Sequence, residues 1–250
     1  MLPHQKLFAE KSELYAKSRP TYPNTWYEYL YSLCEDHEAA WDVGCGTGQV
    51  AKELAKYFGI VLATDISSSQ IEHAEQAKNV EYSVQSAENT NFEDNTFSLI
   101  TVGTALHWFD IPAFWKEVNR TLKKNGILAV FGYSFFKINP EFDTFFQDRI
   151  LEKLKPYWNP RVYALWEKYA NVDFPYQAVE VPTFKMEIQW NLAQVFDFVN
   201  SWSATRACIK DSGDDFFRKA FEKACDLWGN PTQTKNIDMD FFAIVRRKNS

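Results

Sequence analysis

Cysteine is scarce in this chain of 250 residues, and long apolar runs are absent. Its 4 cysteines form no Cys-x-x-Cys pair and have no histidine at metal-ligand spacing, so we expect reduced thiols and no metal site. No stretch approaches the ~20 apolar residues of a membrane span, and the first residues lack the apolar core of a signal peptide. The sequence therefore predicts a cytoplasmic protein without a membrane partner.

Positive charge is also in short supply. The chain has 33 acidic and 27 basic residues, a net charge of −6, so a nucleic-acid partner is not expected. Charged residues at 24% beside 46% hydrophobic residues are typical of a globular chain and exclude a disordered one. No internal repeat or low-complexity linker divides the sequence. We expect one compact domain, as a monomer or a homodimer.

Three of the 9 glycines alternate in the segment Gly44-Cys45-Gly46-Thr47-Gly48, directly after a short apolar run that contains Asp42. Glycines let the backbone turn sharply and let a ligand approach the main chain, while the N–H groups of the following helix point into the gap. The segment predicts a nucleotide-type cofactor loop. A nicotinamide dehydrogenase is one competitor, but its fingerprint requires a third glycine where Gln49 stands.

A second carboxylate, Asp65, ends the apolar run 60–64, about 20 residues after Gly44. At the tip of a second strand, such a carboxylate accepts two hydrogen bonds from a ribose diol. The apolar residues between the two runs recur at helical spacing, so the unit has the pattern strand, loop, helix, strand. The alternative for Asp65 is a helix-capping or turn residue.

Strand and helix patterns alternate along the chain. We predict strands at 39–43, 60–64, 80–84, 97–102 and 126–132, and helices at 49–58, 68–77 and 112–122. A helical cover at 5–35 precedes them, and residues 134–182 carry aromatic helical patterns broken by prolines, which predict an insertion that serves as a lid. Further strands are expected at 184–190 and 241–245, with helices near 192–201 and 214–227.

The chain resembles the class I S-adenosylmethionine-dependent methyltransferases of the type 11 group. The similar segments follow the family's order: residues 42–48 for the first motif, 64–67 for the second, 85–88 for the adenine-side turn, 97–102 for strand four and 122–128 for the turn before strand five. That last turn departs from the family because Lys124 and Asn125 replace its proline and first glycine. The resemblance implies an α/β, Rossmann-like, seven-stranded and mostly parallel sheet with helices on both faces, closed by an antiparallel pair.

The expected parts of this single domain are a helical cover (1–36), a cofactor-binding core (37–133), the insertion (134–182) and a C-terminal part of sheet and helices (183–250). Shorter segments are similar to the trans-aconitate methyltransferase-like subgroup: 15–23, with the pattern Tyr-x-x-x-Arg-Pro-x-Tyr-Pro, then 105–109 and 201–204. These short segments suggest a subgroup and not a substrate. The methyl acceptor that we expect is a small carboxylic acid, converted to its methyl ester.

The resemblance implies that S-adenosylmethionine binds to the loop and strand ends and leaves as S-adenosylhomocysteine. The expected cofactor-binding residues are Asp42, Gly44, Cys45, Gly46, Gly48, Asp65, Ile66, Gln70, Ser86, Ala87, Glu88 and Thr104. In this assignment Asp42 orients the loop or, through water, the cofactor's ammonium group, and Asp65 holds the ribose. Ile66 lies under the adenine ring.

Methyl transfer needs a nucleophile held in line with the S–CH3 bond and shielded from water, more than it needs acid–base chemistry. A carboxylate acceptor needs no base, whereas a hydroxyl or carbon acceptor requires one. His107, Tyr15 and Tyr22 are the candidate catalytic residues, with a wall or packing role as the alternative. Arg19 and Arg206 are candidates to pair with a substrate carboxylate, and Trp108 to line the pocket.

We therefore expect a methyltransferase acting on a small carboxylic acid. One alternative is an O- or C-methyltransferase of a biosynthetic intermediate. Another is an S-adenosylmethionine-binding protein without transfer activity.

Overall fold

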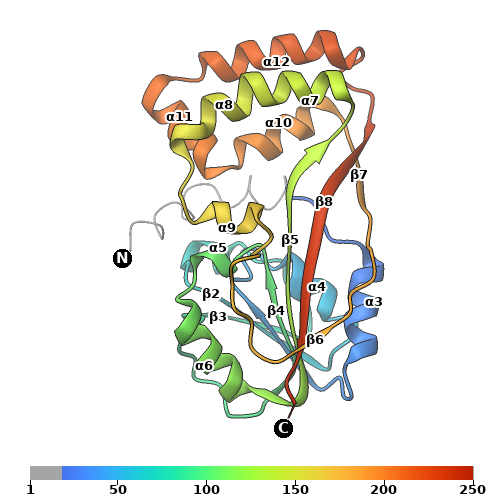
Figure 1. Ribbon diagram of the computed structural model, residues 1–250, viewed down its shortest axis with the longest axis vertical. Coiled ribbons are helices and arrows are strands. Elements are labelled where there is room, and N and C mark those ends of the chain that lie inside the picture. The colour runs from blue at the N-terminus through green and yellow to red at the C-terminus, as the bar shows by residue number, and fades with distance from the viewer. Residues whose placement is uncertain (1–18, 250) are drawn as a thin grey trace.

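A computed structural model describes residues 19–249 (Figure 1), which form an eight-stranded sheet in the order β3-β2-β1-β4-β5-β8-β6, with β7 also paired to β8. The strands are β1 Ala39–Val43, β2 Ile60–Asp65, β3 Val80–Val84, β4 Phe97–Gly103, β5 Leu122–Lys137, β6 Gln177–Val179, β7 Met186–Trp190 and β8 Lys235–Arg247. The first five strands run parallel to one another, and β8 runs antiparallel to β5, β6 and β7. The expected Rossmann-like sheet is present. The strand expected at 241–245 is longer than predicted, and it pairs with two short strands instead of one.

The central strands are buried on both faces. Every residue of β1 is buried, and its side chains alternate: Ala40 packs in the apolar cluster that includes helices α3 and α4, and Trp41 packs with Phe114 of helix α6. Mainly apolar and fully or almost fully buried strands such as β1 and β4 are typical of parallel sheets covered by helices on both sides. The helices that cover this part of the sheet are α3 Asn24–Leu33, α4 Gln49–Leu54, α5 Ser68–Glu72 and α6 Ile111–Thr121. Of the helical cover expected at 5–35, residues 5–18 lie outside the described part.

A second layer of helices stands above the sheet (Figure 1). It comprises α7 Pro140–Phe146, α8 Glu152–Leu154, α10 Leu192–Asn200, α11 Ser203–Ser212 and α12 Asp215–Trp228, with a π-helical turn at Gln147–Leu151 between α7 and α8. We call these five helices the cap. Their apolar sides meet in one buried cluster that includes Phe142, Ile150, Phe198 and Trp228. The cap therefore combines residues from the expected insertion with residues from the C-terminal part of the chain.

The strands β5 and β8 connect the two layers. Their pairing continues from Ile127 and Arg247 in the sheet to Lys137 and Asp238 near the cap. The insertion is thus helical only in part, because residues 134–137 continue β5 and residues 177–179 form β6. A short helix, α9 Val162–Trp166, lies between the cap and the sheet (Figure 1). Within residues 19–249, no helix is both long enough and apolar enough to span a membrane.

Candidate active site

A cavity of about 640 Å³ opens where the parallel strands end, and we call it the large cavity. Its walls come from the residues that follow β1, β2, β3 and β4. This is the edge at which open parallel sheets bind ligands, because the loops after neighbouring strands diverge there. The expected cofactor residues that line it are Gly44, Gly46, Asp65, Ile66, Gln70, Ser86, Ala87, Glu88 and Thr104.

The glycine loop is built from left-handed residues. Gly44, Gly46 and Gly48 have φ angles of 65°, 56° and 84°. Residues with a Cβ atom rarely adopt such angles, whereas glycine adopts them readily. A Cβ atom on Gly48 would also lie 2.8 Å from Cζ of the Tyr82 ring, and the Tyr82 hydroxyl donates to the Glu75 carbonyl at 2.7 Å. Gly48 lines neither the large cavity nor the two smaller cavities described below. It therefore contributes to the shape of the loop.

Asp65 holds the loop from the tip of β2. Its Oδ2 accepts a hydrogen bond from the Gly46 N–H at 2.9 Å, and its Oδ1 accepts one from the Ser67 N–H at 2.9 Å. Burial raises the pKa of this carboxyl, and the backbone donors oppose the rise. A carboxylate has about four lone-pair positions. Asp65 therefore stabilises the turn, as the alternative for this residue proposed. Its carboxylate oxygens can still accept further hydrogen bonds from a ligand in the large cavity that it lines.

Asp42 is the most deeply buried acid of the site. Its Oδ1 accepts a hydrogen bond from the Thr101 hydroxyl at 2.9 Å, and its Oδ2 has no partner among residues 19–249. Burial raises its pKa to about 7. The Thr47 hydroxyl and the Gln49 amide nitrogen are likewise buried without a described partner. Buried polar atoms are almost always hydrogen-bonded, so this group indicates a place for a polar ligand.

Asp42 and Gln49 line a second cavity of about 60 Å³, which we call the loop cavity. The expected cofactor residue Cys45 lines it as well, and so do the substrate candidate Arg19 and the catalytic candidate Tyr22. The Tyr22 hydroxyl lies 2.7 Å from Thr104 Oγ1. Thr104 has a φ of 56°, uncommon for a residue other than glycine.

A third cavity of about 90 Å³ lies between the cap and the sheet, and we call it the cap cavity. The three expected substrate residues Arg19, Trp108 and Arg206 all line it, and so does His107. Thr104 is shared by all three cavities. The geometry therefore brings a large site, a small polar site and a cap-covered site together at one residue.

His107 is held as a neutral ring. Its Nδ1 lies 3.0 Å from the Tyr169 hydroxyl. Burial, with a smaller effect from the charge of Arg161, lowers its pKa to about 3. Arg161 also donates to the Trp108 carbonyl at 2.7 Å, which links the segment before α9 to the wall shared by the large and cap cavities. A ring with so low a pKa is a weak base at neutral pH.

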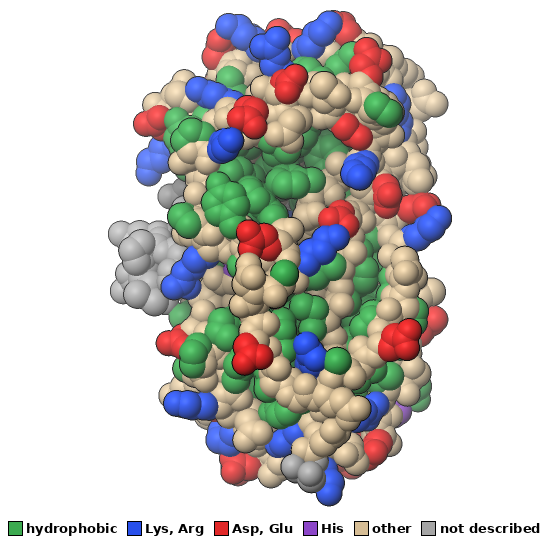
Figure 2. Space-filling view, viewed as in Figure 1, with side chains coloured by type: hydrophobic (Ala, Val, Ile, Leu, Met, Phe, Trp, Pro, Cys, Tyr) green, Lys and Arg blue, Asp and Glu red, His purple; other side chains and the backbone are tan. Residues whose placement is uncertain are grey.

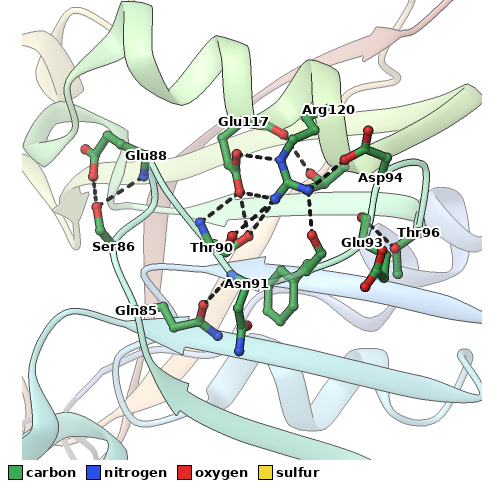
Figure 3. A network of polar contacts seen from close by, with 12 residues as sticks. Gln85, Ser86, Glu88, Thr90, Asn91, Glu93, Asp94, Thr96, Glu117 and Arg120 are labelled. Atoms are coloured by element: carbon green, nitrogen blue, oxygen red, sulfur yellow. Dashed lines mark hydrogen bonds and ion pairs between the residues drawn. The ribbon is translucent and has the colours of Figure 1, made fainter.

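The loop after β3 is fixed from behind by α6. Figure 3 shows Glu117 and Arg120 pointing toward this loop. Glu117 Oε1 accepts hydrogen bonds from the N–H and hydroxyl of Thr90 at 2.8 and 2.5 Å, and Arg120 donates to the Phe92 carbonyl and pairs with Asp94 at 2.8 Å. Burial raises the pKa of Glu117, but the bonds from Arg120 and Thr90 outweigh it and lower the pKa. The network holds the segment that carries Ser86 to Glu88.

Sequence reasoning did not identify several residues that line these cavities. They include Gln49, Gln85, Phe109, Asp110, Tyr133, Trp158, Arg161, Trp166 and Trp202. Four of them carried a signal in the sequence: Gln49 adjoins the glycine loop, and Gln85, Phe109 and Trp202 lie in the segments 85–88, 105–109 and 201–204. Tyr15, expected as a catalytic residue, lies outside the described residues.

Comparisons with known proteins identify the family of the chain. A family model described as a methyltransferase domain matches residues 41–130. A Dictyostelium discoideum protein described as a "Putative methyltransferase" is 30% identical over 248 residues, which cover 96% of this chain and 94% of that one. The structure of a "Putative Type II Methyltransferase" from Anaeromyxobacter dehalogenans superimposes with a TM-score of 0.85 at 27% identity, over 92% of this chain and 98% of that one.

The chain belongs to the class I S-adenosylmethionine-dependent methyltransferases. The nicotinamide alternative is set aside, in agreement with Gln49 at the position of the third fingerprint glycine. The residues fit the cofactor: the glycine loop and Asp65 suit its adenosyl part, and the unpaired Asp42 Oδ2 suits an ammonium group, directly or through water. The likeness to the trans-aconitate-like subgroup stays a prediction.

Proposed function

We propose that the protein transfers the methyl group of S-adenosylmethionine to a carboxylate of a small molecule bound in the cap cavity. The observation that carries this proposal is the charge of that cavity. Arg19 and Arg206 line it, and no Asp or Glu does so within residues 19–249. A guanidinium fork matches the two oxygens of a carboxylate, so an anionic acceptor is favoured there.

In this proposal the chain's residues act by placement. Asp65 and the glycine loop hold the adenosyl part in the large cavity, and Asp42 and Gln49 hold the amino-acid part in the loop cavity. Thr104, which lines all three cavities, then lies beside the sulfur, and the arginines direct the acceptor toward it. Holding the two reactants in line accounts for much of the rate enhancement, and the cap excludes water.

When bound, S-adenosylmethionine supplies an electrophilic methyl group: a carboxylate oxygen forms the O–CH3 bond as the S–CH3 bond breaks, and the electron pair stays on sulfur. No proton moves in this step. That balance agrees with a site in which His107, the one lining histidine within residues 19–249, has its pKa lowered to about 3. A hydroxyl or carbon acceptor would need a stronger base than His107. This disfavours the alternative function, an O- or C-methyltransferase that acts on a hydroxyl or carbon of a biosynthetic intermediate.

The test is an assay of the purified chain with S-adenosylmethionine and a panel of small carboxylic acids, matched with the corresponding alcohols. We expect alkali-labile methyl esters, and a kcat independent of pH above the pKa of the acid. Arg206→Gln should raise KM for the acid without changing cofactor affinity, whereas Arg218→Gln on the exposed face of α12 should change neither. Alkali-stable methylated products would contradict the proposal.

A further inference from the structure

His107 lies on the short helical turn Leu106–Trp108 after β4, and this turn contacts α9. Its half-buried ring lines the cap cavity. Figure 2 shows hydrophobic side chains gathered in a hollow between the cap and α9, while charged side chains lie mostly around it. Apolar surroundings favour the neutral imidazole, in which one ring nitrogen carries a proton and the other accepts a hydrogen bond. The position of that proton decides what His107 presents to the cavity.

The Tyr169 hydroxyl is the neighbour that decides it. This hydroxyl lies 3.0 Å from His107 Nδ1, and it has no other acceptor within residues 19–249. Tyr169 is buried, and burial raises its pKa above the ordinary value, so the hydroxyl keeps its proton at neutral pH. A buried O–H group without an acceptor would carry its full desolvation cost. The Tyr169 hydroxyl therefore donates its proton to Nδ1.

The tautomer of His107 follows from this bond. Since Nδ1 accepts, the neutral ring carries its own proton on Nε2. The opposite tautomer would direct an Nδ1–H group at the Tyr169 oxygen and leave the hydroxyl proton without an acceptor. That oxygen already faces a donor, because the backbone N–H of His107 lies against it and lowers the pKa of Tyr169, in opposition to burial.

Nε2 is the ring nitrogen that remains open to a ligand. Within residues 19–249 it has no hydrogen-bond partner, and it is not among the fully buried polar atoms that lack one, so it keeps accessible surface. His107 lines the cap cavity and neither the large cavity nor the loop cavity. The ring therefore presents an uncharged hydrogen-bond donor to the cap cavity.

The segment that supplies the hydroxyl has an unusual conformation. Lys168 and Tyr169 follow α9 with φ angles of 53° and 56°, which residues other than glycine seldom adopt. Lys168 pairs with Asp240 of β8 at 2.8 Å, and the Tyr169 N–H donates to the Ala164 carbonyl at 2.8 Å. Strained positions persist where the surrounding contacts hold them. These contacts hold the hydroxyl beside His107.

From this geometry we propose that the Nε2–H group of His107 donates to one oxygen of the acceptor carboxylate, and that Tyr169 is the positioning residue that fixes this tautomer. The inference rests on the proposed function and gives His107 a binding role in place of that of a base. A neutral donor matches a reaction in which no proton moves. The ring holds the acid through a carboxylate oxygen and then the ester through its carbonyl oxygen, without gaining or losing a proton.

Nitrogen-15 NMR of the imidazole rings tests the tautomer directly. The chain has 4 histidines, and the signals that disappear in His107→Gln are those of His107. At pH 7 we expect a neutral His107 ring with its proton on Nε2 in the unsubstituted protein. The Nδ1 signal should shift in Tyr169→Phe, which lacks only the hydroxyl. A proton on Nδ1, or an Nδ1 signal that does not respond to the loss of the hydroxyl, would overturn the inference.

Acetate is the probe for the cavity side of the ring. Added to the unsubstituted protein loaded with S-adenosylhomocysteine, it should shift the Nε2 signal of His107. A glutamine amide reaches about as far as Nε2 and an asparagine amide about as far as Nδ1, so His107→Gln should bind acetate more tightly than His107→Asn does. Relative to the unsubstituted protein, His107→Asn should raise the acetate Kd by about tenfold or more. An unmoved Nε2 signal, or equal affinities of the two variants, would contradict the inference.

Kinetics distinguish a binding role from that of a base. With the panel acid of highest kcat/KM, His107→Asn and Tyr169→Phe should raise KM by about tenfold and change kcat far less. Loss of a general base would instead lower kcat by about 10²- to 10⁴-fold, and such a fall would overturn the inference. Tyr163→Phe is the matched control, because Tyr163 lies on α9 with 41% of its surface exposed, and it should change neither constant.

The same assay separates this inference from the proposed function. Ester formation by His107→Asn with an unchanged KM would overturn the inference and leave carboxylate methylation intact. Absence of ester from every acid of the panel, with cofactor binding retained in the unsubstituted protein, would refute the proposed function itself.

Discussion

Replacing Asp65 by asparagine should weaken cofactor binding and the cofactor loop together. The carboxylate accepts hydrogen bonds from the N–H groups of Gly46 and Ser67, both at 2.9 Å. Asparagine is nearly isosteric, but it has one acceptor oxygen and one NH2 group. Whichever way its amide is turned, the NH2 group faces one of the two backbone donors. One of these bonds is lost, and the charge that favoured both is removed.

The size of each effect follows from the bonds involved. A hydrogen bond to a charged group contributes about 1.5–3 kcal/mol. We expect a fall of about that size in the free energy of unfolding, which lowers Tm by roughly 3–12 °C for a chain of this length. The loss of charge-assisted bonds to the ribose should raise the cofactor Kd by about 10- to 150-fold.

The assay is calorimetric titration with S-adenosylhomocysteine, together with thermal unfolding of the cofactor-free protein. Asp226→Asn is the control, because that carboxylate lies on α12, exposed and paired with Lys223 at 3.4 Å. A folded Asp65→Asn protein with an unchanged Kd would remove Asp65 from the cofactor site. An unchanged Tm would show that its two backbone bonds contribute nothing measurable to stability.

Three further variants test other parts of the site. Gly48→Ala should abolish measurable cofactor binding in a calorimetric titration, because the added Cβ clashes with Tyr82 and strains the backbone. The control is Gly213→Ala, where φ is also positive at 77° but the space around the Cβ is open. This control should cost about 1–3 kcal/mol of stability and leave cofactor binding intact. Glu117→Gln should raise the cofactor Kd more than Glu222→Gln in the same calorimetry; equal values would argue against the network behind the loop. Folding raises the pKa of Asp42 to about 7. Between pH 4 and 7 the folded state therefore holds a proton that the unfolded state has released, so the free energy of unfolding should decrease over this range. Denaturant titrations of the cofactor-free protein measure this decrease. Asp42→Asn should flatten this decrease, which is about 4 kcal/mol at most, and an equally steep profile in the variant would refute the assignment.

The cofactor half of the protein was predictable because its signals are local. Strands β1 and β3 have the predicted bounds, because β1 is a short, buried and mainly apolar run next to the glycine loop, and β3 alternates apolar with polar residues. The glycine loop and Asp65 lie together at the sheet edge, as their spacing predicted. These features depend on residues close in sequence, which pattern and propensity describe well.

Long-range bonds explain where the local patterns failed. The helix predicted at 68–77 ends at Glu72 because the following segment binds elsewhere: the Glu75 N–H donates to the Thr47 carbonyl at 3.0 Å, and the Glu75 carbonyl accepts from Tyr82. The strand predicted at 126–132 continues to Lys137, where it pairs with β8. Both outcomes depend on partners that no local pattern reveals.

The cap cavity was the least predictable part of the site. Trp158 and Trp166 lie in segments whose sequence patterns indicate only amphipathic helices or turns, and Trp202 lies in a segment marked only by the subgroup resemblance. The meeting of these three rings depends on how the cap folds over β5 and β8. The sequence did indicate the charged members, Arg19 and Arg206, through the chemistry of a carboxylate acceptor. The aromatic walls required the structure.

The most direct measurement is a crystal structure of the protein with S-adenosylhomocysteine bound. The account predicts ribose oxygens within hydrogen-bond distance of Asp65, the amino group of the ligand near Asp42, and the sulfur beside Thr104 facing the cap cavity. A ligand bound elsewhere, or bound with its sulfur turned away from Arg19 and Arg206, would contradict it.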